Sequence, residues 1–144
     1  MDSRGKIQHR ERMRQLISFD GLRYDNSTPT DVDGLLEWRN RAFIFYEFKM
    51  RGVEMPRGQR VALERVVDAL GMANKSAVLF LCLHDVENPY DDVPAPDAEV
   101  DKVYYKGKWR DGHLWPMRYW TDSFMVNVVG YKPDTDKEQR HGTV

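Results

Sequence analysis

The run of residues 43–48, FIFYEF, constrains the fold more than any other stretch of the sequence. Its apolar and aromatic side chains fall on both faces of an extended chain, as is typical of a strand buried inside a sheet. Glu47 and Lys49 are two residues apart, so both project from one face at the strand's end. Burial leaves each charge in need of a partner.

The residues before this run predict a β-hairpin. If residues 39–41 form the loop, residues 31–38 pair antiparallel with residues 42–49. Asp33 then faces Glu47, and Asp31 lies beside Lys49. A two-residue loop would instead put Asp33 and Glu47 on opposite faces, unless a bulge intervened. A functional pairing of the acids therefore requires the first register.

Two carboxylates directly opposite each other repel unless a cation lies between them. Mg²⁺ prefers such a site, since it takes carboxylate oxygens, carbonyl oxygens and water. Lys49 beside the pair could orient or deprotonate a water, or stabilise charge on a phosphate. These groups together are typical of metal-assisted phosphodiester hydrolysis.

The sequence here resembles the PD-(D/E)xK nuclease superfamily, which includes type II restriction enzymes and archaeal Holliday-junction resolvases. The resemblance is carried by Asp33, by the Glu47-Phe48-Lys49 triplet and by Gln59 near the start of the next helix. The literal Pro-Asp of the signature is absent, which leaves open whether Asp31 or Asp33 is the main metal ligand.

The resemblance implies an α/β (α+β) fold with a restriction-endonuclease-like core over about residues 5–84. Its order would be α-β-β-β-α-β around a mixed sheet flanked by helices, with C-terminal additions. It also implies Mg²⁺ or Mn²⁺ as cofactor, and these ligands: Asp33, Glu47 and the Phe48 carbonyl, with Asp31 and Glu11 as further candidates. Lys49 would position or activate water, and Gln59 would orient water or a phosphate.

Basic residues at two helix starts are candidates for DNA contact. Arg10 and Arg14 fall on a predicted helix over about residues 5–17, and Arg57 and Arg60 open a predicted helix over residues 57–73. Either pair would contact phosphates or form a solvated face. Apolar residues recur along the second helix at the spacing of a face packed on a sheet, at Ala62, Leu63, Val66, Val67 and Leu70.

The remaining segments predict further parts of one domain. A short strand is expected near residues 22–24. Residues 77–83, AVLFLCL, predict a buried strand that gives a crossover and a mixed sheet. Residues 102–105 and 108–110 predict a hairpin. Core packing is expected for the later aromatics Trp115, Tyr119, Trp120 and Phe124, and the run 124–129 is either a strand or the end of a helix begun near Trp115.

Residues 85–101 hold seven acidic residues and no Lys or Arg, which predicts a loop or insertion. We expect one domain over residues 1–131 and a flexible tail over 132–144. Cys82, the single cysteine, favours a core position in a reducing, cytoplasmic protein. No signal-peptide pattern or apolar run of membrane-spanning length is present.

The leading hypothesis is a Mg²⁺- or Mn²⁺-dependent deoxyribonuclease that is structure-selective for junctions or flaps in phage-like recombination or replication and works as a homodimer. The alternative is a catalytically inactive nuclease scaffold that regulates by binding nucleic acid or protein, with residues 85–101 as the partner surface. A hydrolase of another phosphate ester is a third reading.

Overall fold

The computed structural model describes residues 8, 9, 11 and 15–133. The chain divides into two units, Met1–Thr30 and Asp31–Val144. In the described part of the first unit the predicted strand near residues 22–24 is wrong, since Tyr24 only forms an isolated bridge to Ser27. Asp25 adopts a positive φ of 55° within a polar run that favours a turn over a ladder. Most of the predicted helix over residues 5–17 lies outside the described residues.

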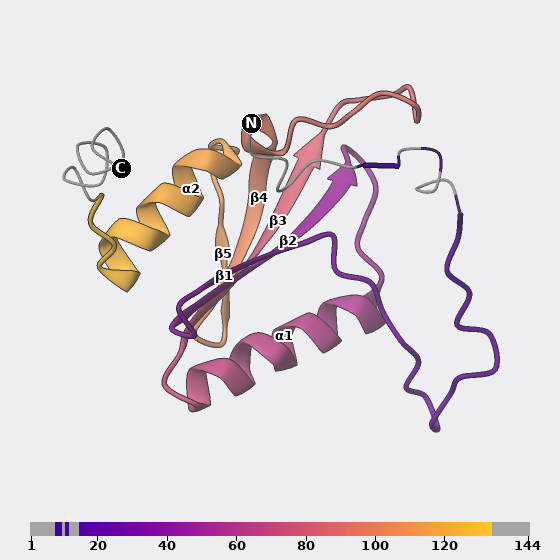
Figure 1. The fold of residues 1–144 in the computed structure, drawn as a ribbon, viewed down its shortest axis with the longest axis horizontal. Coiled ribbons are helices and arrows are strands. Elements are labelled where there is room, and N and C mark those ends of the chain that lie inside the picture. Colours follow the sequence, from indigo (N-terminus) through magenta and orange to yellow (C-terminus); the bar gives the residue numbers. More distant parts are fainter. Residues whose placement is uncertain (1–7, 10, 12–14, 134–144) are drawn as a thin grey trace. The chain divides into compact units, whose positions relative to one another are not determined.

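The second unit is built on a five-stranded mixed sheet in the spatial order β1-β2-β3-β4-β5 (Figure 1). The strands are β1 (Gly34–Trp38), β2 (Ala42–Met50), β3 (Ser76–His84), β4 (Glu99–Tyr105) and β5 (Lys108–Asp111). Only β2 and β3 run parallel, and the other neighbouring pairs are antiparallel. The predicted mixed α/β architecture is therefore confirmed.

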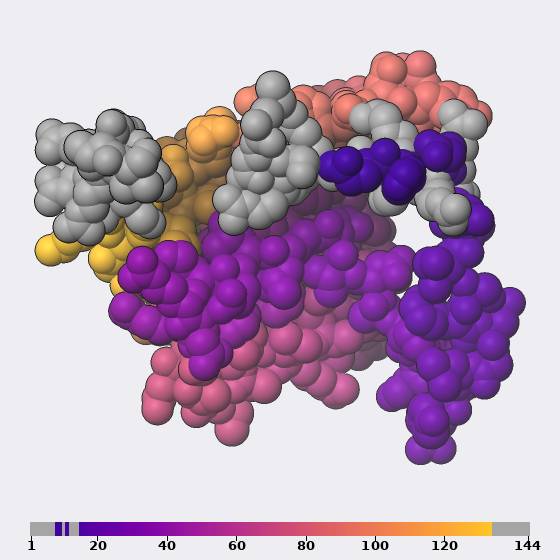
Figure 2. Space-filling view, viewed as in Figure 1, coloured from indigo at the N-terminus to yellow at the C-terminus, as the bar shows by residue number. Residues whose placement is uncertain are grey.

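Helix α1 (Arg57–Met72) is the crossover between the parallel strands, and its bounds fall within one residue of the prediction. Leu63 and Val67 are buried against the sheet, where they meet Phe45 and Leu79. Val66, expected on this packed face, is 42% exposed. In the space-filling view the side chains close the space between α1 and the sheet (Figure 2).

The opposite face of the sheet carries a second core beneath α2 (Met117–Ser123) and the π-helical turn η3 (Phe124–Val129). The run 124–129 is thus the end of a helix rather than a strand. Phe124 is buried and Trp120 packs partly against this core, as predicted. Trp115 and Tyr119 are 45% and 51% exposed, so the prediction that they pack in the core is wrong.

The acidic segment ends earlier than predicted. Residues 85–94 are loop and Ala95–Asp97 form a 3₁₀ turn, but β4 begins at Glu99, where Val100 is fully buried. Val100 and Val103 both belong to the core under α2, because a register shift opposite Leu81 and Cys82 lies between them. The predicted hairpin around Gly107 is confirmed. No described helix is long and apolar enough to cross a membrane.

Candidate functional site

The β1–β2 hairpin has the register that brings the two acids together. Trp38 pairs with Ala42 across a three-residue loop, and the ladder continues to Gly34 opposite Tyr46. Arg39 and Asn40 make this loop by adopting positive φ. The predicted register is confirmed, but the predicted length is wrong, since residues 31–33 lie outside β1.

Asp33 continues the contact with β2 through its side chain. Its carboxylate Oδ2 accepts the backbone N–H of Phe48 at 2.8 Å. Its own backbone N–H donates to Oε1 of Glu47 at 3.2 Å. The carboxylate therefore takes the place of the next ladder partner, which fixes it beside Glu47.

Glu47 is the one buried charged residue of the described chain. Its Oε2 accepts the side-chain amide of Gln59 at 2.9 Å and lies 4.0 Å from Nζ of Lys49. Burial, followed by the neighbouring negative charge of Asp33, raises the pKa of Glu47 to about 7. Two carboxylates held this closely favour a proton or a cation between them.

Lys49 lies on the same face of β2 as Glu47, toward α1, because side chains alternate along a strand. Its side chain is 23% exposed, so the amine combines a buried carboxylate neighbour with access to solvent. Phe48, between the two, packs in the opposite core. The sequence prediction that Glu47 and Lys49 project side by side is confirmed.

Gln59 lies in the first turn of α1, as predicted, and its role in orienting water or a phosphate stays a prediction. The amide donates to Glu47 and to the backbone carbonyl of Asp31 at 3.2 Å. It thus joins α1, β2 and the segment before β1. Asp31 lies outside β1, so the predicted ladder pair with Lys49 is not formed, and no ion pair joins the two side chains among the described residues.

The other predicted site residues are spread more widely. Arg57 and Arg60 are exposed in the first turn of α1, and Arg60 lies 3.8 Å from Glu64. Glu11 belongs to the first unit, where it is exposed beside His9. Arg10 and Arg14 fall outside the described residues, so their predicted DNA contacts stay predictions.

The donor set of this site fits a hard cation. Arg51, directly after β2, donates its N–H to the His84 carbonyl of β3. Because backbone groups alternate in direction along a strand, Lys49 and Glu47 also direct theirs toward β3. Phe48 faces the other way, toward Asp33, on the side where β1 has ended. Its carbonyl can therefore join the carboxylates of Asp33 and Glu47 as a ligand.

Two carboxylates and a carbonyl suit Mg²⁺, which keeps several waters and often takes its remaining ligands from a phosphate substrate. A full protein cage is absent, since no three His, Cys, Asp or Glu side chains cluster as ligands among the described residues. Asp31 is accordingly not part of such a cluster among the described residues, and the predicted role of Glu11, which belongs to the other unit, stays a prediction.

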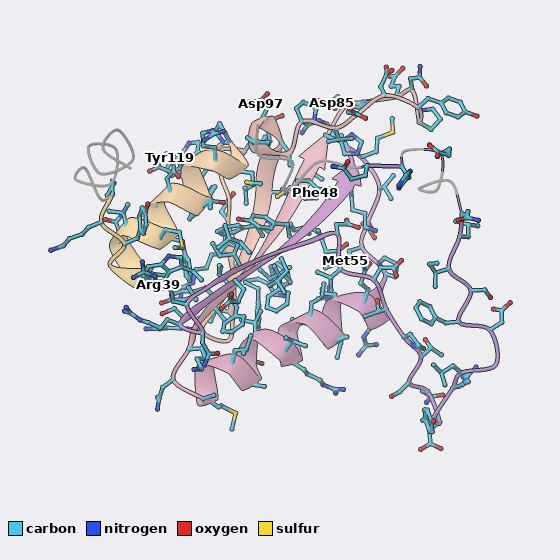
Figure 3. All side chains as sticks on the ribbon, in the orientation of Figure 1. Arg39, Phe48, Met55, Asp85, Asp97 and Tyr119 are labelled. Carbon is cyan, nitrogen blue, oxygen red and sulfur yellow. The ribbon has the colours of Figure 1, made fainter. Side chains whose placement is uncertain are left out.

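Arg51 is a structural residue that sequence reasoning missed. Its guanidinium binds both carboxylate oxygens of Asp85, at 2.9 and 3.1 Å, and also binds Glu99. The pKa of Asp85 is lowered by the hydrogen bonds from Arg51. Arg51 thus joins the ends of β2 and β3 to the start of β4. Phe48 and Asp85 are labelled at this end of the strands in Figure 3.

The site therefore offers paired carboxylates, an amine and the Phe48 carbonyl at one end of β2, an arrangement suited to acid–base chemistry on a bound anion. No protein-family model matches this chain, and no match is found among curated proteins or solved structures.

Proposed function

We propose that this protein is a metal-dependent nuclease of the PD-(D/E)xK type that hydrolyses phosphodiester bonds of DNA. The observation that carries the proposal is the convergence of Asp33, Glu47 and Lys49 where β1 stops pairing with β2. The succession β1-β2-α1-β3, with Gln59 in α1 bonded to Glu47, supports a restriction-endonuclease-like core.

Each residue has a role that follows from its contacts. Asp33, Glu47 and the Phe48 carbonyl would hold Mg²⁺ or Mn²⁺, which supplies Lewis-acid stabilisation of the phosphate and a hydroxide at neutral pH. Lys49 orients the attacking water or balances charge on the phosphate. Gln59 fixes the rotamer of Glu47 and the position of the Asp31 backbone.

The start of α1 supports an anionic substrate. The helix begins after Pro56 with no side-chain cap and no acidic residue in its first turn. The free N–H groups and the positive end of the helix dipole favour a phosphate there. Arg57 and Arg60 are exposed at the same turn and add positive charge.

The test is cleavage of labelled linear, nicked, flap and four-way-junction DNA in Mn²⁺, with Lys49→Ala and Asp33→Asn proteins alongside. Cutting by the wild type alone supports the nuclease and ranks the structures it prefers. Full activity in either variant contradicts the mechanism, because both lose a group that the chemistry requires. Light scattering across concentrations tests the homodimer.

One observation favours the second candidate, a scaffold without catalysis. Both carboxylate oxygens of Glu47 already accept hydrogen bonds from the protein, from Asp33 and from Gln59. A site satisfied in this way can be purely structural. Thermal unfolding separates the two candidates, since only the nuclease should be stabilised by Mg²⁺ or Mn²⁺.

A further inference from the structure

The segment between β5 and α2 displays aromatic side chains on the surface. His113, Trp115 and Tyr119, here called the aromatic platform, are each about half exposed. The ring of Trp115 lies 5.0 Å from each of the other two ring centroids and 5.8 Å from that of Trp120 beneath it. The platform is therefore a connected set of rings supported by a partly buried tryptophan.

The backbone just before Trp115 is strained at two successive residues. His113 and Leu114 have φ of 58° and 57°, in the left-handed region that side-chain-bearing residues avoid. Two successive residues in this conformation persist only where the surroundings enforce them, which is a reason to look for function.

Five hydrogen bonds enforce the conformation. Val100 of β4 accepts the N–H of Leu114 and donates its own N–H to the carbonyl of Trp115. The N–H of His113 donates to Asp111 at 2.7 Å. Gly112 donates its N–H to Asp101 and accepts the indole N–H of Trp120 at 2.8 Å.

Gly112 also packs against β4 so closely that a Cβ would lie 2.2 Å from the Val100 carbonyl oxygen. The segment is consequently held to the sheet along its length, and the platform is a preformed surface.

Register places the platform at the same end of the sheet as the proposed site. Lys49 pairs with Leu83, Leu83 pairs with Glu99, and Glu99 bridges to Pro116, next to Trp115. Three strand spacings separate Lys49 from Pro116, a distance of roughly 14 Å. Lys49 faces α1 and the platform lies on the α2 side, so one ligand reaches both by crossing the strand ends.

We propose that the aromatic platform stacks on unpaired bases of a single-stranded segment of the DNA substrate, an inference that rests on the proposed nuclease function. Each base offers a π-face to Trp115 or Tyr119 whatever its sequence. Arg118 and Asp122, both exposed on α2 with Tyr119, carry opposite charges, and Asp111 is engaged by His113. Ring contacts rather than phosphate contacts therefore supply the affinity of the platform, and salt weakens it little.

Binding is measured in metal-free buffer in the Lys49→Ala background, by anisotropy of a labelled oligothymidylate and of a duplex of equal length. Trp115→Ala and Tyr119→Ala should each weaken oligothymidylate binding by about tenfold and leave duplex binding unchanged. Val126→Ala, which removes an exposed apolar side chain of η3, should change neither.

Trp115→Phe keeps a ring and should keep most of the affinity. Adding the oligonucleotide should quench less tryptophan fluorescence in this variant than in the protein that retains Trp115. That combination identifies direct stacking, which a purely structural role of Trp115 would not produce. Oligothymidylate affinity unchanged in both alanine variants overturns the platform and assigns the rings to a protein partner.

Cleavage by the unmodified protein separates this proposal from the nuclease proposal. Metal-dependent cutting in which Trp115→Ala loses its preference for flaps over duplex supports both. Cutting that is indifferent to Trp115→Ala overturns the platform alone. Base stacking without any cutting overturns the nuclease alone, and the platform is then a single-strand binding surface.

Discussion

The carboxylate of Asp33 accepts the backbone N–H of Phe48 at 2.8 Å, and this bond replaces the ladder contact that Val32, two residues before Gly34, would have made. A side chain thus completes the pairing of a strand. The carboxylate is held beside Glu47 by the backbone, which explains how two acids stay close despite their repulsion.

Asp33→Asn tests this arrangement with little change of shape. The amide oxygen can still accept the Phe48 N–H, so the free energy of unfolding should change by less than about 1 kcal/mol. Metal-dependent cleavage should fall by about a hundredfold or more, because the negative charge is lost. Kinetics and urea unfolding on the same preparation check both parts; equal activity would contradict the metal role of Asp33.

Glu47 should make the stability of the metal-free protein depend on pH. Its folded pKa of about 7 lies above the unfolded value of 4.5, so the folded state favours the protonated form. The resulting stabilisation is complete below about pH 4.5 and is lost as pH rises through 7. Urea unfolding from pH 5 to 8 should show this loss in the wild type and a smaller loss in Glu47→Gln.

Adding Mg²⁺ at pH 8 should restore stability to the wild type, because a cation favours the ionised pair. Glu47→Gln, with no such pair, is the control. A wild type that ignores Mg²⁺ at pH 8 would favour the scaffold without chemistry.

Gln59→Met should loosen the site without removing a charge. The variant keeps the size of the side chain but cannot donate to Glu47 or to the Asp31 carbonyl. We expect a loss of about 1–2 kcal/mol in the free energy of unfolding, and a fall in activity of about ten- to a hundredfold. Arg65→Met, on an exposed position of α1, is the matched control. Unchanged kinetics in Gln59→Met would show that Glu47 needs no such support.

Arg51→Met should free the strand ends at the same edge of the sheet. Hydrogen exchange of the amides near Asp85 and Glu99 should quicken, while the centre of β3 stays protected. Asp85 has a lowered pKa in the folded protein. Its contribution to folding stability is therefore present when the pH is above its unfolded pKa, and it is lost as the pH falls through its folded pKa. Arg51→Lys, unable to bind both carboxylate oxygens of Asp85 at once, should show part of the effect. Equal exchange rates in all three proteins would contradict this role.

Two glycines should respond oppositely to alanine. Gly112→Ala places a Cβ 2.2 Å from the Val100 oxygen and should destabilise the protein by about 2 kcal/mol or more. Gly71→Ala meets nothing within 4 Å near the end of α1 and should stabilise it by about 0.5–1 kcal/mol. Thermal unfolding of the two variants shows whether the loss of stability comes from the close packing at Gly112 or from replacing any glycine by alanine.

The hairpin register, the bounds of α1 and the buried position of β3 could all be predicted, because each depends on local periodicity. Residues 43–48 are apolar on both faces, and α1 repeats its apolar residues at helical spacing. The same reasoning brought Glu47 and Lys49 to one face and Gln59 to the first turn of the helix.

Contacts between distant segments could not be read from the sequence. Nothing local shows that Arg51 will meet Asp85 and Glu99, which lie 34 and 48 positions further along the chain. Trp115 and Tyr119 were assigned to the core because large aromatic side chains are usually buried. The left-handed backbone at His113 and Leu114, just before Trp115, is a feature that no local pattern predicts.

Because side chains alternate along β2, its last residues contribute to two different parts of the protein. Tyr46 and Phe48 belong to the core under α2, while Glu47 and Lys49 face α1 and carry the proposed chemistry. Substitutions at the first pair would act on folding through the core. Substitutions at the second pair would act on the proposed chemistry and, at Glu47, also on the bonds to Asp33 and Gln59. One strand end therefore carries two separable sets of constraints, one on each face of the sheet.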